Sequence, residues 1–385
     1  MSPLASSAVS AAASSALSPR SVAASLRVPL SVLDLAPVAA GSTPGEALRA
    51  TLALARRAEQ LGFTRYWVAE HHNMPGIASS APAVLVGQLA AVTARIRVGS
   101  GGVMLPNHTP LVVAEQFGML EALHPGRIDL GLGRAPGTDP ATARALRRDA
   151  GGLSAEDFPQ QLAELRAFFS GGFPESHPYR GITAVPALGY PPEVWLLGSS
   201  GYSAQVAGLL GLPFAFAHHF SAHNTLPALE LYRSRFTPNG EPGALEQPYA
   251  MVAAAVLVAD TGERARYLAG SAGLSWLRLR AGRPGPTPTP QEAERYPYQP
   301  HEQAVVDERL STMVIGSPQT VRQGLLELLE ATQANELMVT TSTHDPADRL
   351  HSFDLLAGLA GLPAAHGEPA PADAASLRAP AAAAT

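Results

Sequence analysis

Tyr66-Trp67-Val68-Ala69-Glu70-His71-His72-Asn73 is the stretch that decides the fold. It begins with β-favouring aromatic and aliphatic residues and ends abruptly in an acid, two histidines and an amide. This pattern indicates a buried strand whose C-terminal end opens on a polar site, and in α/β proteins that end of a strand carries the chemistry. Taken alone, the segment would also fit a strand that runs out into a solvated loop.

Apolar runs alternate with helical patterns on both sides of this stretch. Eight such pairs favour a (β/α)8 TIM barrel over a doubly wound sheet. Pro- and Gly-rich segments at 171–192 and 281–312 are expected to be loop excursions at the C-terminal face. The expected strands are 28–35, 64–69, 96–105, 127–133, 193–197, 213–217, 249–259 and 336–341. The expected helices are 42–61, 82–93, 111–123, 155–169, 204–210, 226–236, 261–278, 317–331 and 346–362.

Composition sets limits on the domain organisation and the partners. The chain has 385 residues, of which 46% are hydrophobic and 15% charged, with a net charge of −5. Residues 1–27 are rich in Ala and Ser and residues 363–385 in Ala and Pro, so both ends are expected to be disordered and the barrel to span residues 28–362. With no basic block and no apolar run near 18–20 residues, we expect no nucleic-acid or membrane partner and a cytoplasmic location.

Cysteine is absent from the chain. This excludes disulfides, a thiolate nucleophile and a metal site with cysteine ligands.

Closing the strands into a barrel would bring their C-terminal ends to one mouth. The chemistry-bearing side chains would then converge from segments that lie far apart in the sequence. They are Asp34, Glu70, His71, His72, Gly101, Gly102, Asn107, His108, Arg134, Ser199, Ser200, Ser203, His218, His219 and the segment 341–344.

The turn from Gly198 to Ser203 offers backbone N–H groups and hydroxyls at a helix N-terminus, which suits a phosphate group. Arg134 should lie at the same mouth and could pair with the same anion. The alternative is an ordinary serine N-cap. The turn lacks the Lys-Ser or Lys-Thr signature of a Walker loop.

The two histidine pairs are candidates for acid–base chemistry or for metal binding. Adjacent residues on a strand point to opposite sides, so we do not expect His71 and His72 to bind one ion together, and no metal site is expected. One histidine of the pair should face the cavity and the other should be structural, and His218 and His219 should divide in the same way. Glu70 could be a buried partner that fixes a histidine tautomer.

Several ordered motifs together resemble the bacterial luciferase-like flavin-dependent monooxygenase family, in its generic oxidoreductase branch. Each motif alone is weak, but their common order and spacing over about residues 28–360 is specific. They are Leu61-Gly62-Phe63, Tyr66-Trp67, Glu70-His71-His72, Val98-Gly99-Ser100-Gly101-Gly102-Val103-Met104-Leu105-Pro106, Glu115-Gln116, Pro125-Gly126-Arg127, Leu130-Gly131-Leu132-Gly133-Arg134, Gly198-Ser199-Ser200-Gly201-Tyr202-Ser203 and Ile315-Gly316-Ser317-Pro318.

The resemblance implies a barrel that binds reduced FMN, or in some branches a deazaflavin, at the C-terminal mouth. It assigns His71 as the active-site histidine and Gly101-Gly102 as a non-prolyl cis peptide beside the flavin ring, where small residues and a tight surrounding fit are expected. It assigns binding of the FMN phosphate to Arg134, Ser199, Ser200 and Ser203, and it places His218 and His219 near the flavin ring. Gly133 stands where the luciferase itself has a reactive cysteine, which argues against light emission and a long-chain aldehyde substrate.

The family's partners follow from the same resemblance. We expect an FMN-dependent monooxygenase that receives reduced FMN from a separate flavin reductase, oxygenates a small organic substrate with molecular oxygen, and forms a homodimer. Two alternatives stay open at this point. One is a deazaflavin-dependent hydride-transfer enzyme on the same barrel, and the other is a non-catalytic flavin-binding subunit.

Overall fold

The computed structural model describes residues 26–135, 139–147, 157–240 and 244–363. The two ends that were expected to be disordered, residues 1–27 and 363–385, lie almost wholly outside these ranges. Among the described helices, none combines the length and the apolar character needed to cross a membrane.

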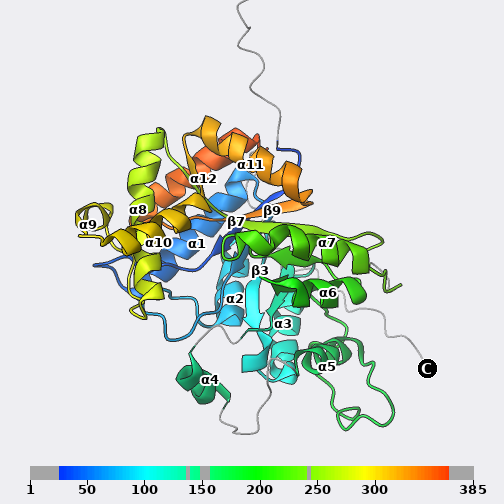
Figure 1. The fold of residues 1–385 in the computed structure, drawn as a ribbon. Helices are drawn as coiled ribbons and strands as arrows, with labels where there is room; N and C mark the ends of the chain where they lie inside the picture. Colours follow the sequence, from blue (N-terminus) through cyan, green and yellow to red (C-terminus); the bar gives the residue numbers. More distant parts are fainter. Residues whose placement is uncertain (1–25, 136–138, 148–156, 241–243, 364–385) are drawn as a thin grey trace, which may run out of the picture.

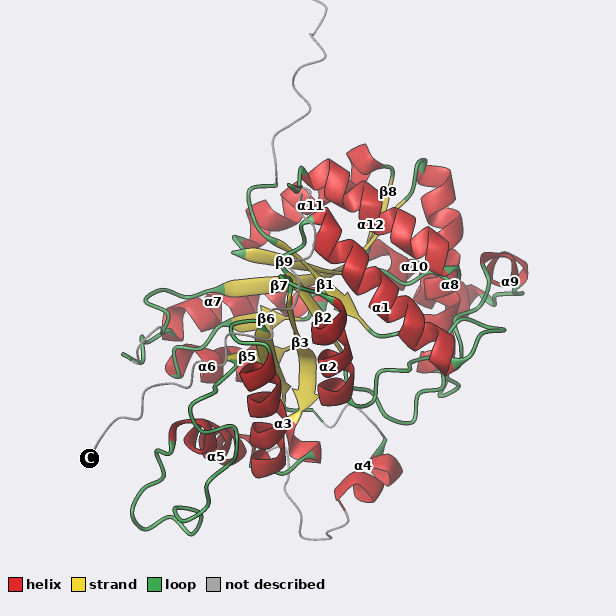
Figure 2. Ribbon diagram, turned by 180° about the vertical axis from the view of Figure 1, so that it is seen from behind, coloured by secondary structure: helices red, strands yellow, loops and turns green. Residues whose placement is uncertain are grey.

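Eight parallel strands close into a ring at the centre of the molecule (Figure 2). Neighbouring strands pair in chain order from the first to the sixth, the sixth pairs with β7, and β7 pairs with β9, which returns to β1. The predicted (β/α)8 barrel is therefore confirmed. The strands are β1 (Leu30–Asp34), β2 (Arg65–Val68), β3 (Arg97–Met104), β4 (Ile128–Gly133), β5 (Glu193–Gly198), β6 (Phe214–Phe216), β7 (Ala250–Val258) and β9 (Glu336–Thr340).

Helices surround the ring and cover its outer face (Figure 1). The first begins at a capping box, in which the Thr43 hydroxyl accepts from the Glu46 amide and the Glu46 carboxylate accepts from the Thr43 amide. It ends at Gly62, which has a left-handed φ of 86°. The covering helices are α1 (Pro44–Leu61), α2 (Pro82–Val92), α3 (Pro110–Leu123), α5 (Phe158–Ser170), α6 (Gly201–Leu209), α7 (Thr225–Arg235), α8 (Gly262–Arg280), α11 (Pro318–Thr332) and α12 (Pro346–Ala360).

The second excursion is not the loop that its proline content predicts. It contains α9 (Pro290–Arg295), α10 (Pro300–Ser311) and, directly after it, β8 (Val314–Gly316). Both helices start with their proline, a position where the missing N–H removes no helical hydrogen bond. β8 lies outside the ring and pairs with Val256–Val258, the end of the long strand β7.

A further short helix that the sequence did not predict, α4 (Pro140–Arg147), follows β4. Residues 171–192 lack helix and strand, as expected, but they lead from α5 into the start of β5 and do not line the cavity at the C-terminal end, so this excursion is not at the predicted face.

The N-terminal end of the ring is plugged by a buried ionic network. Arg65 pairs with Asp129 at 3.0 Å and with Glu336 at 3.1 Å, and all three side chains are almost completely buried. Above the network, Trp67 packs edge-on against Trp195 with 5.3 Å between ring centroids, and the Trp67 indole donates to Asp129. Because each of these residues lies in the barrel interior near the start or middle of a strand, the ring is closed at this end and a ligand can enter only from the other.

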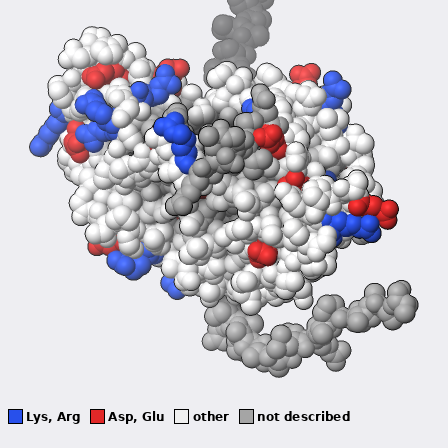
Figure 3. All heavy atoms as spheres, turned by 90° about the horizontal axis from the view of Figure 1, so that it is seen from below, with Lys and Arg blue, Asp and Glu red and all other residues white. Residues whose placement is uncertain are grey.

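Charges are spread over the surface in mixed groups. On the face shown in Figure 3, basic side chains lie beside acidic ones and form no broad basic area among the described residues. This distribution is typical of a protein whose ligand site is a cavity rather than a charged face.

Candidate active site

A cavity of about 500 Å³ lies at the C-terminal end of the barrel, which is within the usual size of small-molecule sites. The resemblance assigned nine residues to the site. Seven of them line this cavity, and they come from five different strand ends. Those seven are His71, Gly101, Arg134, Ser199, Ser200, Ser203 and His219; the other two, Gly102 and His218, are not part of the lining. The structure thus brings most of the predicted set together around one space.

The end of β2 is organised by the buried carboxylate of Glu70. It accepts hydrogen bonds from His72 Nε2 at 3.0 Å, from His108 Nε2 at 2.9 Å and from the Met104 amide at 3.0 Å. Burial works against its ionised form, but the bonds from His108 and His72 outweigh burial, and the pKa of Glu70 is lowered. His72 therefore turns to Glu70, while His71 lines the cavity, so the predicted division of this histidine pair is confirmed.

Glu70→Gln is expected to lower the free energy of unfolding at pH 7 by about 1–3 kcal/mol, because neutral amide bonds replace charge-assisted ones in a buried site. The folded-state pKa of Glu70 lies below its ordinary value near 4.5, so its contribution is present above that pH and is lost as the pH falls through the folded pKa. The variant should therefore lose less stability than the wild type between pH 5 and about pH 3. Urea unfolding at several pH values measures this, with the exposed Glu294→Gln on α9 as control. Parallel pH curves would contradict the assignment.

The peptide between Gly101 and Gly102 is cis, as the resemblance implied. A Cβ atom at Gly102 would lie 2.3 Å from Leu197 Cδ1 and 2.8 Å from the Gly131 carbonyl oxygen, and one at Gly101 would lie 2.9 Å from Leu33 Cδ1. Both positions therefore exclude any larger residue, and Gly101 presents bare backbone to the cavity.

A candidate anion site lies where β4 and β5 end. The Arg134 guanidinium lies 4.2 Å from the centroid of the Tyr202 ring, and within the described residues it pairs with no carboxylate. Ser200 is the N-cap of α6, yet its hydroxyl makes no capping bond to that helix. Ser203 is buried and lines the same cavity. Free amide groups at a helix start, hydroxyls and an arginine without an acidic partner are the donor set that binds phosphate.

The second histidine pair also divides. His219 lines the cavity, and its Nδ1 donates to the Ala253 carbonyl oxygen at 3.0 Å. Burial, with the nearby Arg309, lowers the pKa of His219 to about 4, so this imidazole is neutral at pH 7 and its Nε2 is unprotonated. His218 instead bonds Thr225 Oγ1 at 2.8 Å and lies outside the lining. Its predicted place near the flavin ring is not supported by its position.

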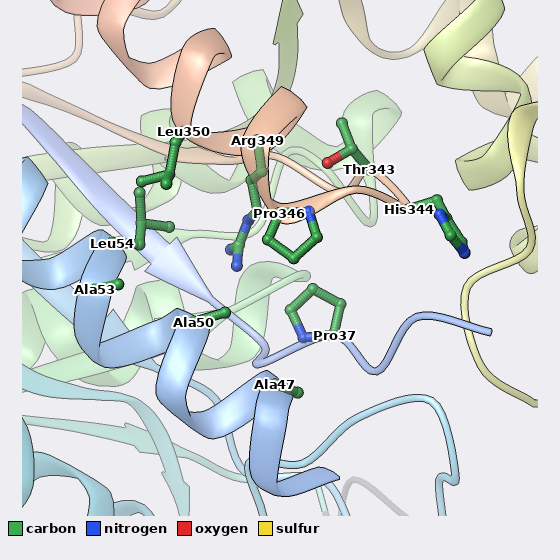
Figure 4. Close-up of a pocket in the computed structure, with 10 residues that line it drawn as sticks. All are labelled: Pro37, Ala47, Ala50, Ala53, Leu54, Thr343, His344, Pro346, Arg349 and Leu350. Atoms are coloured by element: carbon green, nitrogen blue, oxygen red, sulfur yellow. The ribbon is translucent and has the colours of Figure 1, made fainter. Parts of the chain in front are cut away.

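Asp34 does not supply a free group to the mouth, contrary to the prediction, whereas Thr341 and Ser342 of the segment after β9 line the main cavity. The Asp34 carboxylate is fully buried and bonds Arg349 at 2.8 Å and Thr51 at 2.7 Å. His344 bonds the Ala40 carbonyl at 3.0 Å. Figure 4 shows Arg349 and His344 beside a second, smaller cavity of about 110 Å³ between α1 and the start of α12. These residues join the helices to the barrel.

One wall of the main cavity was missed by sequence reasoning. It is formed by α8 and α10, which carry Trp276, Leu279 and Arg309, together with Met313. The Arg309 guanidinium carbon lies 4.9 Å from the centroid of the Trp276 ring. The sequence predicted residues 281–312 at this face as a loop, so it gave no sign that Arg309 would be held on a helix with its side chain in the cavity wall. In Figure 1, α8, α9 and α10 form a group on one side of the barrel.

Comparison with known proteins gives a consistent result. The family model for luciferase-like monooxygenases matches residues 28–336. The chain is 53% identical to the uncharacterized protein YvbT of Bacillus subtilis over 328 residues, covering 85% of this chain and 95% of that protein. It is 49% identical to a luciferase-like monooxygenase of Escherichia coli, covering 85% of this chain and 96% of that protein.

Solved structures agree with these relatives. The structure of apo-MsnO8 superposes with a TM-score of 0.79 at 37% identity, covering 88% of this chain and 100% of that one. A type II Baeyer-Villiger monooxygenase, the oxygenating constituent of 3,6-diketocamphane monooxygenase in complex with FMN, has a TM-score of 0.65 at 19% identity over 86% of this chain and 97% of that one. The second likeness concerns the fold alone.

Proposed function

The chain belongs to the luciferase-like monooxygenase family, and on that premise we propose that it is a flavin-dependent monooxygenase that uses reduced FMN and molecular oxygen on a small organic substrate. The observation that carries the proposal is the convergence of His71, Gly101, Arg134 and the Ser199–Ser203 turn on one cavity. An arginine and a serine-lined helix start fit the phosphate of FMN, and bare backbone fits a flat ring system.

The residues present would hold FMN by its two ends. Arg134, Ser199, Ser200 and Ser203 would bind the phosphate, and Gly101 would lie against the ring. Bound reduced FMN would supply two electrons, so that one atom of oxygen enters the substrate and the other leaves as water.

The chain itself binds, orients and excludes water. His71 would exchange a proton with the reacting groups at the imidazole that it presents to the cavity. His219, held neutral and fixed by the Ala253 carbonyl, would offer Nε2 as a hydrogen-bond acceptor. The wall formed by α8 and α10 would keep the reaction away from bulk water.

Cofactor binding and turnover test the proposal. The purified protein is titrated with FMN and with a deazaflavin, and then supplied with a flavin reductase, NADH, FMN and oxygen while candidate substrates are screened for oxygenated products. We expect tighter binding of FMN and product formation that requires oxygen. Preference for the deazaflavin, or product formation without oxygen, would contradict the proposal. The separate reductase and the cytoplasmic location stay predictions.

We also propose a homodimer, formed through α2 and α3. These helices lie side by side (Figure 1) and expose Val84 by 70%, Met119 by 52% and Leu123 by 67%. Large exposed apolar side chains on adjacent helices mark an interaction surface.

The variant that changes Met119→Lys and Leu123→Lys is expected to sediment as a monomer where the wild type sediments as a dimer. Leu209→Lys, on an equally exposed site of α6, is the control and should leave the dimer intact. A monomeric wild type would overturn this proposal.

A further inference from the structure

The charges in the lining of the main cavity are unbalanced. Its described residues include three arginines, at 134, 309 and 349, and neither an Asp nor a Glu. Arg349 is neutralised by Asp34 at 2.8 Å, and Arg134 belongs to the anion site at the start of α6. Arg309 remains, and throughout the described ranges it forms an ion pair with no carboxylate.

The surroundings of Arg309 leave its charge available to a ligand. The side chain is half-buried, and one of its N–H groups donates to the His219 carbonyl oxygen. Its guanidinium also lies over the Trp276 ring, which attracts the cation without neutralising it. Because the cation is partly removed from water, the pKa of Arg309 is lowered. A guanidinium has five N–H donors, so most of them are left for an anion in the cavity.

The surface around this cation is apolar. Phe220 packs edge-on against Trp276, with 6.3 Å between ring centroids, and Leu279 and Met313 complete the wall. A ligand that fits this wall has an apolar body and one negatively charged group. A planar carboxylate matches the guanidinium best, because both can form two parallel hydrogen bonds.

We propose that Arg309 binds the carboxylate of the substrate and that the wall of Phe220, Trp276, Leu279 and Met313 binds its apolar body, so that the substrate class is small apolar organic acids. This inference rests on the proposed function, because it assigns the second anion site of a cavity whose first would hold the FMN phosphate. It places the substrate against α8 and α10 and the flavin against the strand ends, with His71 and His219 on the strand side.

A structural role for Arg309 is the competing explanation. Its bond to the His219 carbonyl oxygen ties α10 to the end of β6, so that the arginine could simply hold the excursion on the barrel. Such a clamp would affect the binding of every ligand that touches the wall. An anion site would affect only ligands that carry the negative charge. Matched ligands that differ in charge alone therefore separate the two roles.

The experiment compares straight-chain carboxylic acids of four to ten carbons with their primary amides, by calorimetric titration of the full-length protein with FMN bound. In the wild type, at least one acid is expected to bind ten or more times more tightly than its amide. Arg309→Gln should remove this preference and leave amide binding within about threefold. Arg309→Lys should keep part of the preference, because lysine keeps the positive charge but lacks the planar guanidinium that donates two parallel hydrogen bonds. Arg278→Gln is the matched control on α8, since Arg278 pairs with Glu292 outside the cavity lining.

Three results would overturn the inference. They are equal binding of acids and amides by the wild type, equal loss of acids and amides in Arg309→Gln, and loss of FMN rather than acid binding in that variant. Titration with FMN alone is the separate test of the flavin. If the wild type does not bind FMN but still prefers acids when titrated without it, the proposed function is refuted and the anion site stays in place, so the two failures are distinguishable.

Discussion

His71→Ala is expected to reduce product formation by about 10²–10⁴-fold while FMN binding stays within about threefold of the wild type. His71 lines the cavity but does not lie at the anion site, so its removal should not affect binding of the FMN phosphate. Its neighbour His72 is engaged by Glu70, and the backbone amide of His71 is fixed by the Ser79 carbonyl at 3.0 Å, so the local fold should survive the change. Single-turnover product formation and FMN fluorescence titration measure the two quantities.

His351→Ala is the matched control for this variant. His351 is exposed, pairs with Asp260 and lies outside the cavity lining, so both turnover and FMN binding should be unchanged. Unchanged turnover in His71→Ala would remove this histidine from the mechanism. A parallel loss of FMN binding and turnover would make it a binding residue instead. His71→Gln, which keeps a hydrogen-bonding side chain, should restore activity only in part, because its amide cannot exchange a proton near neutral pH.

Arg134→Ala is expected to weaken FMN binding by about 10- to 100-fold and riboflavin binding by less than about threefold. The two ligands differ only in the phosphate, and charge-assisted hydrogen bonds to an ionised group are worth about 1.5–3 kcal/mol. Arg134 has no carboxylate partner within the described residues, so its removal leaves no buried acid uncompensated. Titrations of the apoprotein with each ligand, followed by flavin fluorescence, measure the difference.

Two control variants accompany this prediction: one keeps the positive charge at position 134, and the other removes an arginine away from the cavity. Arg134→Lys keeps the charge but loses the planar fork and its stacking on Tyr202, so FMN affinity should fall between that of the wild type and Arg134→Ala. Arg264→Ala removes an exposed arginine that pairs with Asp348 away from the cavity, and it should change neither affinity. If Arg134→Ala weakens FMN and riboflavin equally, the arginine does not bind the phosphate.

The order of the eight ring strands and of the helices that cover them could be predicted from the sequence. Strands of a parallel barrel are buried on both faces, so each is a short, nearly continuous apolar run, as Ala250–Val258 shows. The position of the site was also predictable, because polar residues such as His71 and Arg134 directly follow such runs and closure of the ring brings strand ends together.

Only the tertiary structure decided which side chains face the cavity and which are neutralised elsewhere. Asp34 looked like a site residue, but its partner Arg349 lies 315 positions further along the chain. His218 and His219 look alike in the sequence, and only the positions of Thr225 and the Ala253 carbonyl show which one lines the cavity. Arg309 entered the site because a proline-rich segment folded into helices against α8. Local sequence determines the elements, since periodicity and capping act over a few residues, whereas pairing of charges depends on contacts between segments hundreds of residues apart.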